Sequence, residues 1–364
     1  MSNIVSLGKY AKIKTGKLDA NASSSDGNYP FFTCSRIPLR ISSYSYDCEC
    51  VLVAGNGDLN VKYYEGKFDA YQRTYIIESL DKQELNVRYL YYFLDKYIEK
   101  LRELSIGGVI KYIKLENLTQ VQIPLPPLPV QQKIADVLDR TNALIEKRKA
   151  QIEKLDLLIK SQFIEMFGDP VTNPMGWEVK LFSDIAFVDT KMTTDFEKYE
   201  DIPHIGIDNI EKETGELINY RCVKDSGLIS GKYIFDDRHI IYSKIRPNLN
   251  KVALPSFIGL CSADAYPVLP NAENCNRIFL AMIMRSDVFL QQILAQSSRT
   301  NIPKVNKQQL LSVMMPHPPI EIQTQFAAFV GRVEAQKAQL KKGLELIELE
   351  YKSLMQKCLG GDLP

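Results

Sequence analysis

The chain carries two copies of one long segment, and this internal duplication constrains its fold more than any other feature. Residues 118–168 align with residues 310–360 without a gap, at a shift of 192 residues. Unrelated segments would not keep one register over that length, so the sequence predicts two copies of one structural unit. The identical pairs include Leu118/Leu310, Val121/Val313, Pro124/Pro316, Pro127/Pro319, Gln131/Gln323, Ala135/Ala327, Arg140/Arg332, Lys149/Lys341, Glu153/Glu345, Leu157/Leu349, Lys160/Lys352, Ser161/Ser353 and Gly168/Gly360.

The body of each copy has the pattern of a long amphipathic helix. Its seam residues recur at alternating steps of four and three, which is typical of a coiled coil about five heptads long. Each helix is expected to follow an extended Pro-rich stretch, Pro124 to Pro129 or Pro316 to Pro319, and to end at Gly168 or Gly360. The predicted apolar seam contains Ile134, Leu138, Ile145, Ile152, Leu155, Ile159, Phe326, Val330, Val333, Leu340, Leu344 and Ile347.

The two helices are expected to pair with each other, because two unrelated surface helices would not share one register. Pairing about a pseudo-two-fold axis would make them antiparallel and would place the domains that precede them at opposite ends. A helix of this length spans roughly 50 Å at about 1.5 Å per residue.

The segments before the helices predict two compact domains of mixed α/β (α+β) class. Each opens with a short strand pattern, at residues 7–17 and 182–192, and has further strand signals at residues 48–55 and 238–245. A helical stretch follows at residues 87–104 and 277–296, and then a polar loop and a strand at residues 105–115 and 297–307. The predicted division is a first domain at residues 1–123, a Pro-rich lead and helix at 124–168, a linker and second domain at 169–315, and a second lead and helix at 316–364.

The two copies of the long helix agree more closely than the two globular domains do, and this difference bears on function. The helices agree in register and in many residues, whereas the globular domains agree only in outline. A repeated surface that stays alike suggests two copies of one partner, and paired domains that diverge suggest two different ligands.

The composition narrows the class of protein. Hydrophobic residues make up 45% and charged residues 24% of the chain, which is typical of a globular protein. No apolar run is long enough to span a bilayer, so the sequence predicts a cytoplasmic protein without a membrane role. Seven cysteines at irregular spacing predict reduced thiols, with neither a disulfide framework nor a zinc site.

The combination of diverged domains and Pro-led helices resembles the specificity subunits of type I restriction-modification systems. The most specific part is the phrase PLPPLPVQQKIA at Pro124 to Ala135, with its echo at Pro316 to Ala327. The segment FGDPVTNPMGW at Phe167 to Trp177 is similar to the family's link into the second domain. The resemblance covers essentially the whole chain.

The resemblance implies a fold and a set of partners. In that family two target-recognition domains, separated by antiparallel coiled-coil helices, each read one half of a bipartite, asymmetric site in double-stranded DNA. The helices act as a ruler and bind two methyltransferase (modification) subunits, and restriction/translocase subunits join through the complex. S-adenosylmethionine, ATP and Mg²⁺ are bound by the other chains, so this chain is expected to be non-catalytic and to bind no cofactor or metal.

A DNA-reading role suggests candidate residues in Gly-rich or irregular segments, because polar side chains read base edges and phosphates. The net charge of +1 is lower than is usual for DNA-binding proteins, so the positive charge must be clustered or a partner must supply phosphate contacts. The candidates in the first domain are Asn56, Lys62, Tyr63, Gln72, Arg73, Lys111 and Tyr112. Those in the second are Lys244, Arg246, Asn248, Asn250, Lys251, Arg299, Asn301 and Lys304.

Catalytic motifs are weak throughout the sequence. The segment His317 to Ile320 lacks the polar first residue and the aromatic of an amino-methyltransferase phrase, and no Gly-rich loop has P-loop spacing. Two alternatives stay open at this point. The chain could be a coiled-coil protein-binding scaffold with no DNA role, which the near-neutral charge favours slightly, or an enzyme with a degenerate site.

Overall fold

The computed structural model describes residues 3–297 and 303–359, and it divides the chain into two compact units. Unit 1 comprises Met1–Gln151 and Leu340–Pro364, and unit 2 comprises Ile152–Gln339. Each unit therefore holds one globular domain and part of each long helix, a different division from the four consecutive segments predicted from the sequence.

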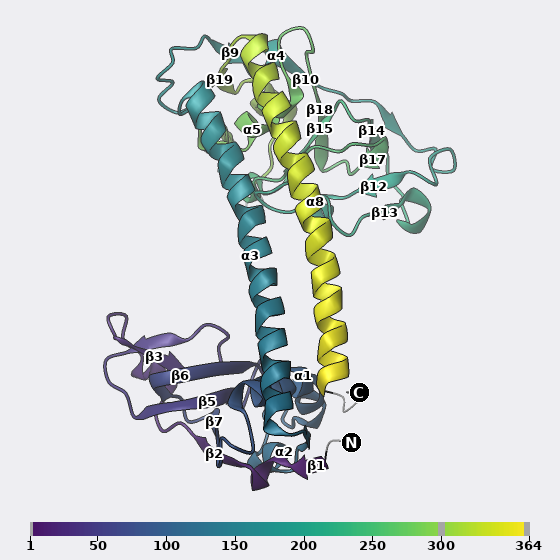
Figure 1. Cartoon of the computed structure of the whole chain (residues 1–364). Coiled ribbons are helices and arrows are strands. Elements are labelled where there is room, and N and C mark those ends of the chain that lie inside the picture. The colour runs from purple at the N-terminus through teal and green to yellow at the C-terminus, as the bar shows by residue number, and fades with distance from the viewer. Residues whose placement is uncertain (1–2, 298–302, 360–364) are drawn as a thin grey trace. The chain divides into compact units, whose positions relative to one another are not determined.

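The domain of unit 1 is built on a six-stranded sheet covered by one helix (Figure 1). The strand order is β2-β7-β5-β6-β3-β4. Helix α1, Val87–Leu104, has the predicted bounds and packs its apolar face on β5 and β6, while the Asn86 side chain caps it by accepting from the Tyr89 amide. The strands of the sheet are β2 Ala11–Thr15, β3 Tyr29–Phe32, β4 Leu39–Ile41, β5 Tyr46–Ala54, β6 Val61–Ala70 and β7 Thr74–Ser79. The remaining elements are β1 Asn3–Ser6, which pairs with β8 Gln122–Leu125, and the short helices η1 Leu7–Lys9, η2 Ala20–Ala22 and α2 Leu115–Thr119.

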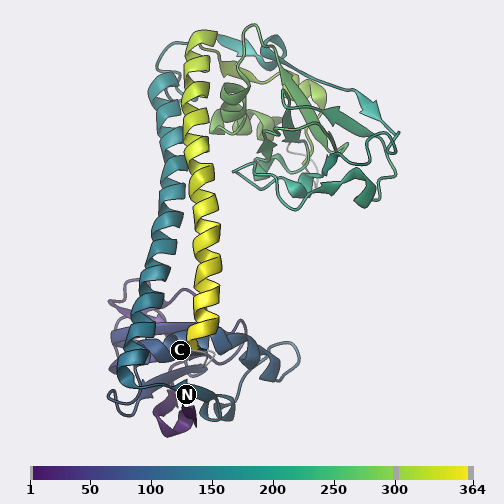
Figure 2. The ribbon, with the colours of Figure 1, turned by 45° about the vertical axis from the view of Figure 1, so that its right-hand side comes forward.

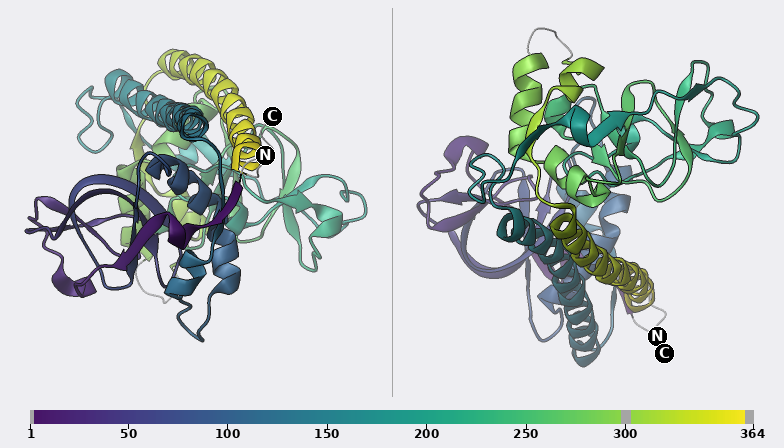
Figure 3. Two further views of the ribbon diagram at one scale, coloured as in Figure 1. Left: turned by 60° about the horizontal axis from the view of Figure 1, so that its bottom comes forward. Right: turned by 90° about the horizontal axis from the view of Figure 1, so that it is seen from above.

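The domain of unit 2 uses two smaller sheets, and its helices lie to one side of the strands (right-hand view of Figure 3). One sheet has the order β10-β18-β15-β16 and the other has the order β11-β14-β17-β12-β13. Their strands are β10 Ala186–Val188, β11 Met192–Thr193, β12 Pro203–Ile205, β13 Arg221–Cys222, β14 Lys232–Phe235, β15 Ile240–Ser243, β16 Val252–Ala253, β17 Gly259–Cys261 and β18 Ala265–Pro270. A further pair is β9 Val179–Leu181 with β19 Met314–Pro316, and the short helices are α4 Phe182–Ile185, η3 Ile207–Asn209, η4 Val223–Asp225, η5 Pro247–Leu249 and α7 Lys307–Leu311.

The helical stretch predicted at residues 277–296 is two helices, α5 Arg277–Met284 and α6 Asp287–Ser297. The break falls where tertiary contacts replace helical hydrogen bonds. The Arg285 carbonyl accepts from Asn250 Nδ2 at 2.8 Å, and the Arg285 guanidinium donates to the Val252 carbonyl at 2.6 Å. Among the described residues no single helix is long and apolar enough to cross a membrane, although α5 and α6 taken together across their 58° bend have the length and composition of a span.

The two long helices are α3, Leu128–Phe167, and α8, Ile320–Leu359, each 40 residues long. Helix α3 begins inside the Pro-rich stretch that was predicted to be extended, so that part of the prediction is wrong. Pro129 is tolerated because the first amides of a helix have no intrahelical acceptor. Helix α3 ends before Gly168, as predicted, and Gly168 has a φ of 76°. Gly360 lies outside the described residues.

Within each unit the two long helices pack against each other in opposite directions (Figure 2). In unit 1, Leu138 near the start of α3 shares a core with Met355 and Leu359 at the end of α8. In unit 2, Phe163 near the end of α3 meets Phe326 near the start of α8, with ring centroids 5.5 Å apart. All twelve predicted seam residues are buried or half-buried.

A duplicated glutamine joins each domain to its long helix. Gln131 in α3 donates from Nε2 to the carbonyls of Glu84 and Pro126 at 2.7 and 2.8 Å and accepts from the Asn86 amide at 2.9 Å. Gln323 in α8 repeats this pattern with the carbonyls of Asn274 and Pro318 and the Asn276 amide. Both glutamines are fully buried, so each one fixes the entry to α1 or α5 against the start of the long helix.

Candidate nucleic-acid interface

Three loops of the first domain are held together by main-chain hydrogen bonds. The Gly55 amide donates to the Arg73 carbonyl at 2.8 Å, and the Ile113 amide donates to the Gly55 carbonyl at 2.9 Å. The Gly57 amide donates to the Lys111 carbonyl at 3.0 Å. We call this arrangement, in which the loops around residues 55–57, 73 and 111–113 are joined, the loop frame of the first domain.

The second domain contains the same frame. The Lys244 amide donates to the Asp264 carbonyl at 3.0 Å, and the Val305 amide donates to the Lys244 carbonyl at 2.8 Å. The Arg246 amide donates to the Pro303 carbonyl at 2.9 Å. The frames correspond at shifts of 189 to 192 residues, so Gly55 corresponds to Lys244, Gly57 to Arg246 and Arg73 to Asp264.

The first loop frame gathers most of the candidates predicted in its domain. Asn56, Gln72, Arg73, Lys111 and Tyr112 lie in it or beside it, and Asn56 forms a β-bridge with Tyr112. The side chains of Arg73 and Lys111 are exposed.

The two candidates on β6 point to opposite faces of the sheet, because successive strand residues alternate. Lys62 Nζ donates to Asn60 Oδ1 beside the loop frame, and burial lowers the pKa of Lys62 to about 8. Tyr63 faces the other way: its hydroxyl donates to Glu49 Oε1 at 3.0 Å, and its ring lies 6.4 Å from that of Tyr91 on α1. The structure therefore does not bring Tyr63 together with the other six candidates.

The candidates in the second loop frame differ in whether their side chains are exposed or held by hydrogen bonds within the domain. Arg246 and Asn248 are exposed, whereas Asn250 is held by the Arg285 carbonyl and Lys251 Nζ donates to the Ile207 carbonyl at 2.7 Å. Lys304 Nζ lies 3.6 Å from Asp264 Oδ1. Arg299 and Asn301 lie outside the described residues.

Lys244 has an unusual environment for a lysine. Its residue is buried, and Nζ lies 4.6 Å from the centre of the Tyr266 ring and 5.9 Å from that of Tyr233. Burial lowers the pKa of Lys244, and the charge of Lys304 adds to this effect. The ammonium group is thus held in place by aromatic faces, which attract cations.

Two exposed apolar residues in the first domain escaped the sequence prediction. Val109 is fully exposed and Ile110 is 61% exposed, directly after Gly107 and Gly108 in the loop that leads into the frame. Neither residue is polar or basic, the properties on which the predicted candidates rest, although apolar groups can contact a thymine methyl group or wedge between bases. The signal available in the sequence was the Gly-Gly pair followed by two branched apolar residues.

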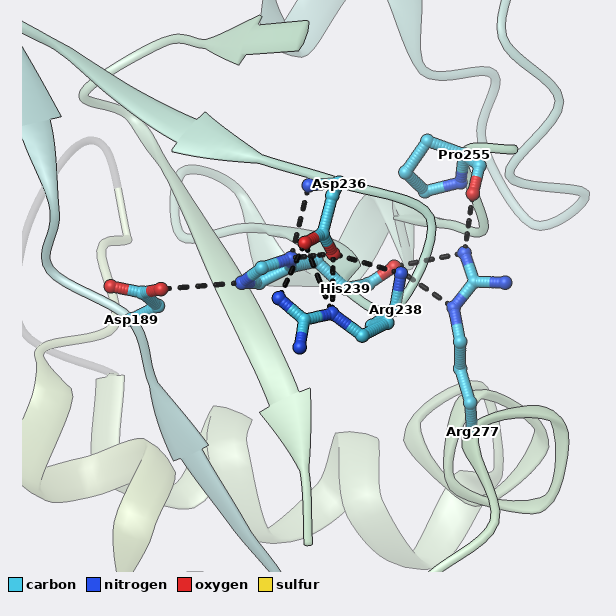
Figure 4. Close-up of polar contacts among 6 residues, drawn as sticks. All are labelled: Asp189, Asp236, Arg238, His239, Pro255 and Arg277. Atoms are coloured by element: carbon cyan, nitrogen blue, oxygen red, sulfur yellow. Dashed lines mark hydrogen bonds and ion pairs between the residues drawn. The ribbon is translucent and has the colours of Figure 1, made fainter. Parts of the chain in front are cut away.

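A cluster of polar contacts in unit 2 holds the turn that leads into β15 (Figure 4). His239 is buried, with Nδ1 2.8 Å from Asp236 Oδ1 and Nε2 3.4 Å from Asp189 Oδ2. Arg238 holds the pKa of Asp236 well below its usual range, and Arg277 donates to the carbonyls of His239 and Pro255. These contacts fix the start of β15, and the end of β15 leads into the second loop frame. Among the residues described, no group of three His, Cys, Asp or Glu side chains is placed to hold a metal ion.

The fold and the loop frames define a class of internally duplicated proteins, built from two α/β domains and two long paired helices. Residues 2–154 and 174–351 match the family model described as the type I restriction modification DNA specificity domain. The chain therefore belongs to the family of type I restriction-modification specificity subunits, as the Pro-led helices predicted, and it is a DNA-binding component of such a system.

Individual relatives agree with this assignment. The specificity subunit of the type I restriction enzyme EcoDI from Escherichia coli is 32% identical over 99% of this chain and 88% of its own length. The MjaIX specificity subunit of Methanocaldococcus jannaschii is 26% identical over 76% of this chain and 68% of its own. A crystal structure of the type I restriction-modification S subunit from M. genitalium has the same fold, with a TM-score of 0.67 at 15% identity over 99% of this chain and 96% of that one.

Proposed function

We propose that this chain selects the DNA sequence on which a type I restriction-modification complex acts, by reading a bipartite, asymmetric site with one domain on each half. The observation that carries this proposal is the repeated loop frame with different side chains. Gly55, Gly57 and Arg73 in the first frame correspond to Lys244, Arg246 and Asp264 in the second. One scaffold with two sets of side chains is suited to two different half-sites.

The chemistry of modification and cleavage is assigned in this proposal to partner subunits. S-adenosylmethionine, ATP and Mg²⁺ would be bound there, as would the restriction and translocation activities. The net charge of +1 fits this division, because partners would then supply many of the phosphate contacts that dominate DNA affinity.

Co-expression of the chain with its methyltransferase subunit, followed by methylation sequencing of the host DNA, tests the proposal. We expect one methylated motif made of two unlike half-sites and an unread gap. We also expect the purified complex to bind that motif with an affinity that falls as salt rises, because phosphate contacts release counterions. A complex that assembles but methylates no split motif and shows no salt-dependent DNA binding would instead support a protein-binding scaffold.

The long helices are proposed to bind two copies of the methyltransferase subunit. Leu157 in α3 and Leu349 in α8 correspond at the 192-residue shift and are 60% and 66% exposed. Each follows a seam residue, Leu155 or Ile347, by two positions and so lies on the opposite side of its helix. An exposed apolar side chain repeated in both copies is suited to one partner bound twice.

Leu157→Asp and Leu349→Asp are each expected to remove one of the two methyltransferase subunits, and the double variant both. A buried charge in an apolar contact should weaken each association at least about tenfold. Mass measurement of the assembled complex gives the stoichiometry, and thermal melting of the chain should be unchanged. Leu144→Asp is the matched control, since Leu144 is 45% exposed, corresponds to Gln336 in the other copy and lies 13 residues from Leu157 on a different side of α3. Two subunits on every variant would contradict this docking surface.

A further inference from the structure

We propose that Arg246 reads a guanine in the second half-site, donating from its guanidinium to the N7 and O6 atoms in the major groove. This inference deepens the proposed function and rests on it. It assigns one residue and one base chemistry to a surface that the family assignment describes only as a whole domain.

The backbone of Arg246 is held where residues with a side chain are rarely found. Its φ and ψ are 50° and 62°, in the left-handed region that glycine occupies most easily. Pro247 follows directly, and a residue before proline is restricted further, toward extended conformations. An unfavourable conformation at a loop residue points to a function of its side chain.

The first domain shows what the loop frame itself requires at this position. The corresponding residue is Gly57, with a φ of 68°, and its amide makes the equivalent hydrogen bond to the neighbouring loop. A Cβ atom at Gly57 would meet nothing within 4 Å, so the position is open to solvent and needs no side chain for packing. The loop frame therefore requires a residue with left-handed backbone angles at this position, and glycine adopts them without strain.

Neither backbone preference nor contacts among the described residues explain an arginine at this position. Its side chain is exposed, and among the described residues no hydrogen bond or ion pair of its guanidinium is found. The backbone around it is fixed by the bond to the Pro303 carbonyl, by the Leu249 amide donating to the Arg246 carbonyl at 2.9 Å, and by buried Pro247. Within the described part of the chain, the guanidinium is thus unpaired and is presented from a rigid base.

Base reading is the use that suits this arrangement best. A phosphate contact needs only a positive charge, which a flexible lysine in an ordinary loop supplies. The planar guanidinium of arginine matches the two acceptors of guanine. This match distinguishes guanine from the other bases only if the guanidinium is held at a fixed place. The exposed amide of Asn248, two residues on, is available for an adjacent base.

The test compares Arg246→Gly with the unchanged chain, each in complex with the methyltransferase subunit. Glycine removes the guanidinium and relieves the backbone, so thermal stability should stay equal or rise. Methylation sequencing should show relaxed choice at one base pair of the second half-site, with discrimination there falling about five- to one-hundred-fold. The first half-site should be unchanged. Arg246→Lys, which keeps the charge without the planar guanidinium, should relax the same base pair.

Arg221→Ala is the control, because Arg221 is also exposed in the second domain but lies on β13, outside the loop frame. It should leave the motif unchanged. An unchanged motif with Arg246→Gly would overturn the inference, and so would an equal loss of binding to all sequences, which indicates a phosphate contact, or a loss of thermal stability, which indicates a structural role. If the unchanged complex yields no split motif, the proposed function fails first.

Discussion

One additional heptad in each long helix, inserted after Gln151 in α3 and after Gln339 in α8, is expected to move methylation to a site with a longer gap. Seven residues keep the seam in phase, so the helices can pair as before. They lengthen each helix by about 10 Å, at about 1.5 Å per residue. At about 3.4 Å per base pair the gap should grow by at most about three base pairs.

The original site should then be methylated at least about one-hundred-fold less efficiently, because both half-sites can no longer be engaged together. Methylation sequencing of the variant complex gives the new gap. Two residues inserted at the same places form the control, since about 200° of rotation turns the seam outward and should lower thermal stability. A heptad variant that folds and keeps the original gap would contradict the proposal that the long helices set the gap between the half-sites.

Phe326→Ala is expected to destabilise unit 2 by about 3–5 kcal/mol, the usual cost of removing a buried phenylalanine. The Phe326 ring is completely buried, with its centroid 5.5 Å from that of Phe163 and 5.3 Å from that of Phe167. Equilibrium denaturation of the full chain measures the change. The matched control is Leu349→Ala on the same helix, where 66% exposure predicts a change within about 0.5 kcal/mol. A loss below about 1 kcal/mol for Phe326→Ala would contradict this core.

In unit 1, the contact between the domain and the long helices is made by different residues from those in unit 2. Ile134 takes the place of Phe326 at the 192-residue shift, and Arg88 on α1 pairs with Asp136 and Asp139 on α3. The two aspartates correspond to Ala328 and Gly331 in the second copy, which cannot form such pairs. The duplication thus preserved the helical seam while each domain acquired its own lateral contacts.

Features with a local periodic signal could be predicted from the sequence. The seam residues repeat every seven positions, and α1 has a continuous apolar face, so its bounds were predicted correctly. The break between α5 and α6 could not be predicted in this way, because it depends on Asn250, 35 residues from Arg285 in the chain. The start of α3 at Leu128 could not be predicted either, because a proline fits an extended segment as well as the first turn of a helix.

The loop surface was only partly predictable for the same reason. Residue chemistry indicated Arg246 and Lys111, and the structure places both in loop frames. The frames themselves are main-chain contacts between loops far apart in sequence, and no side-chain pattern encodes them. Tyr63 was included for its chemistry, although the alternation of strand residues would have separated it from Lys62. Whether these residues contact DNA stays a prediction.

The two buried glutamines have a consequence for how such proteins can change. Gln131 and Gln323 bond only to main-chain atoms of the residues that flank the starts of α1 and α5 and the long helices. Hydrogen bonds to main-chain carbonyls and amides do not depend on which side chains the bonded residues carry. Genetic exchange of one whole domain for another of the same backbone would therefore leave these main-chain hydrogen bonds intact, whereas side-chain contacts such as those of Arg88 with Asp136 and Asp139 would have to be matched by the incoming domain.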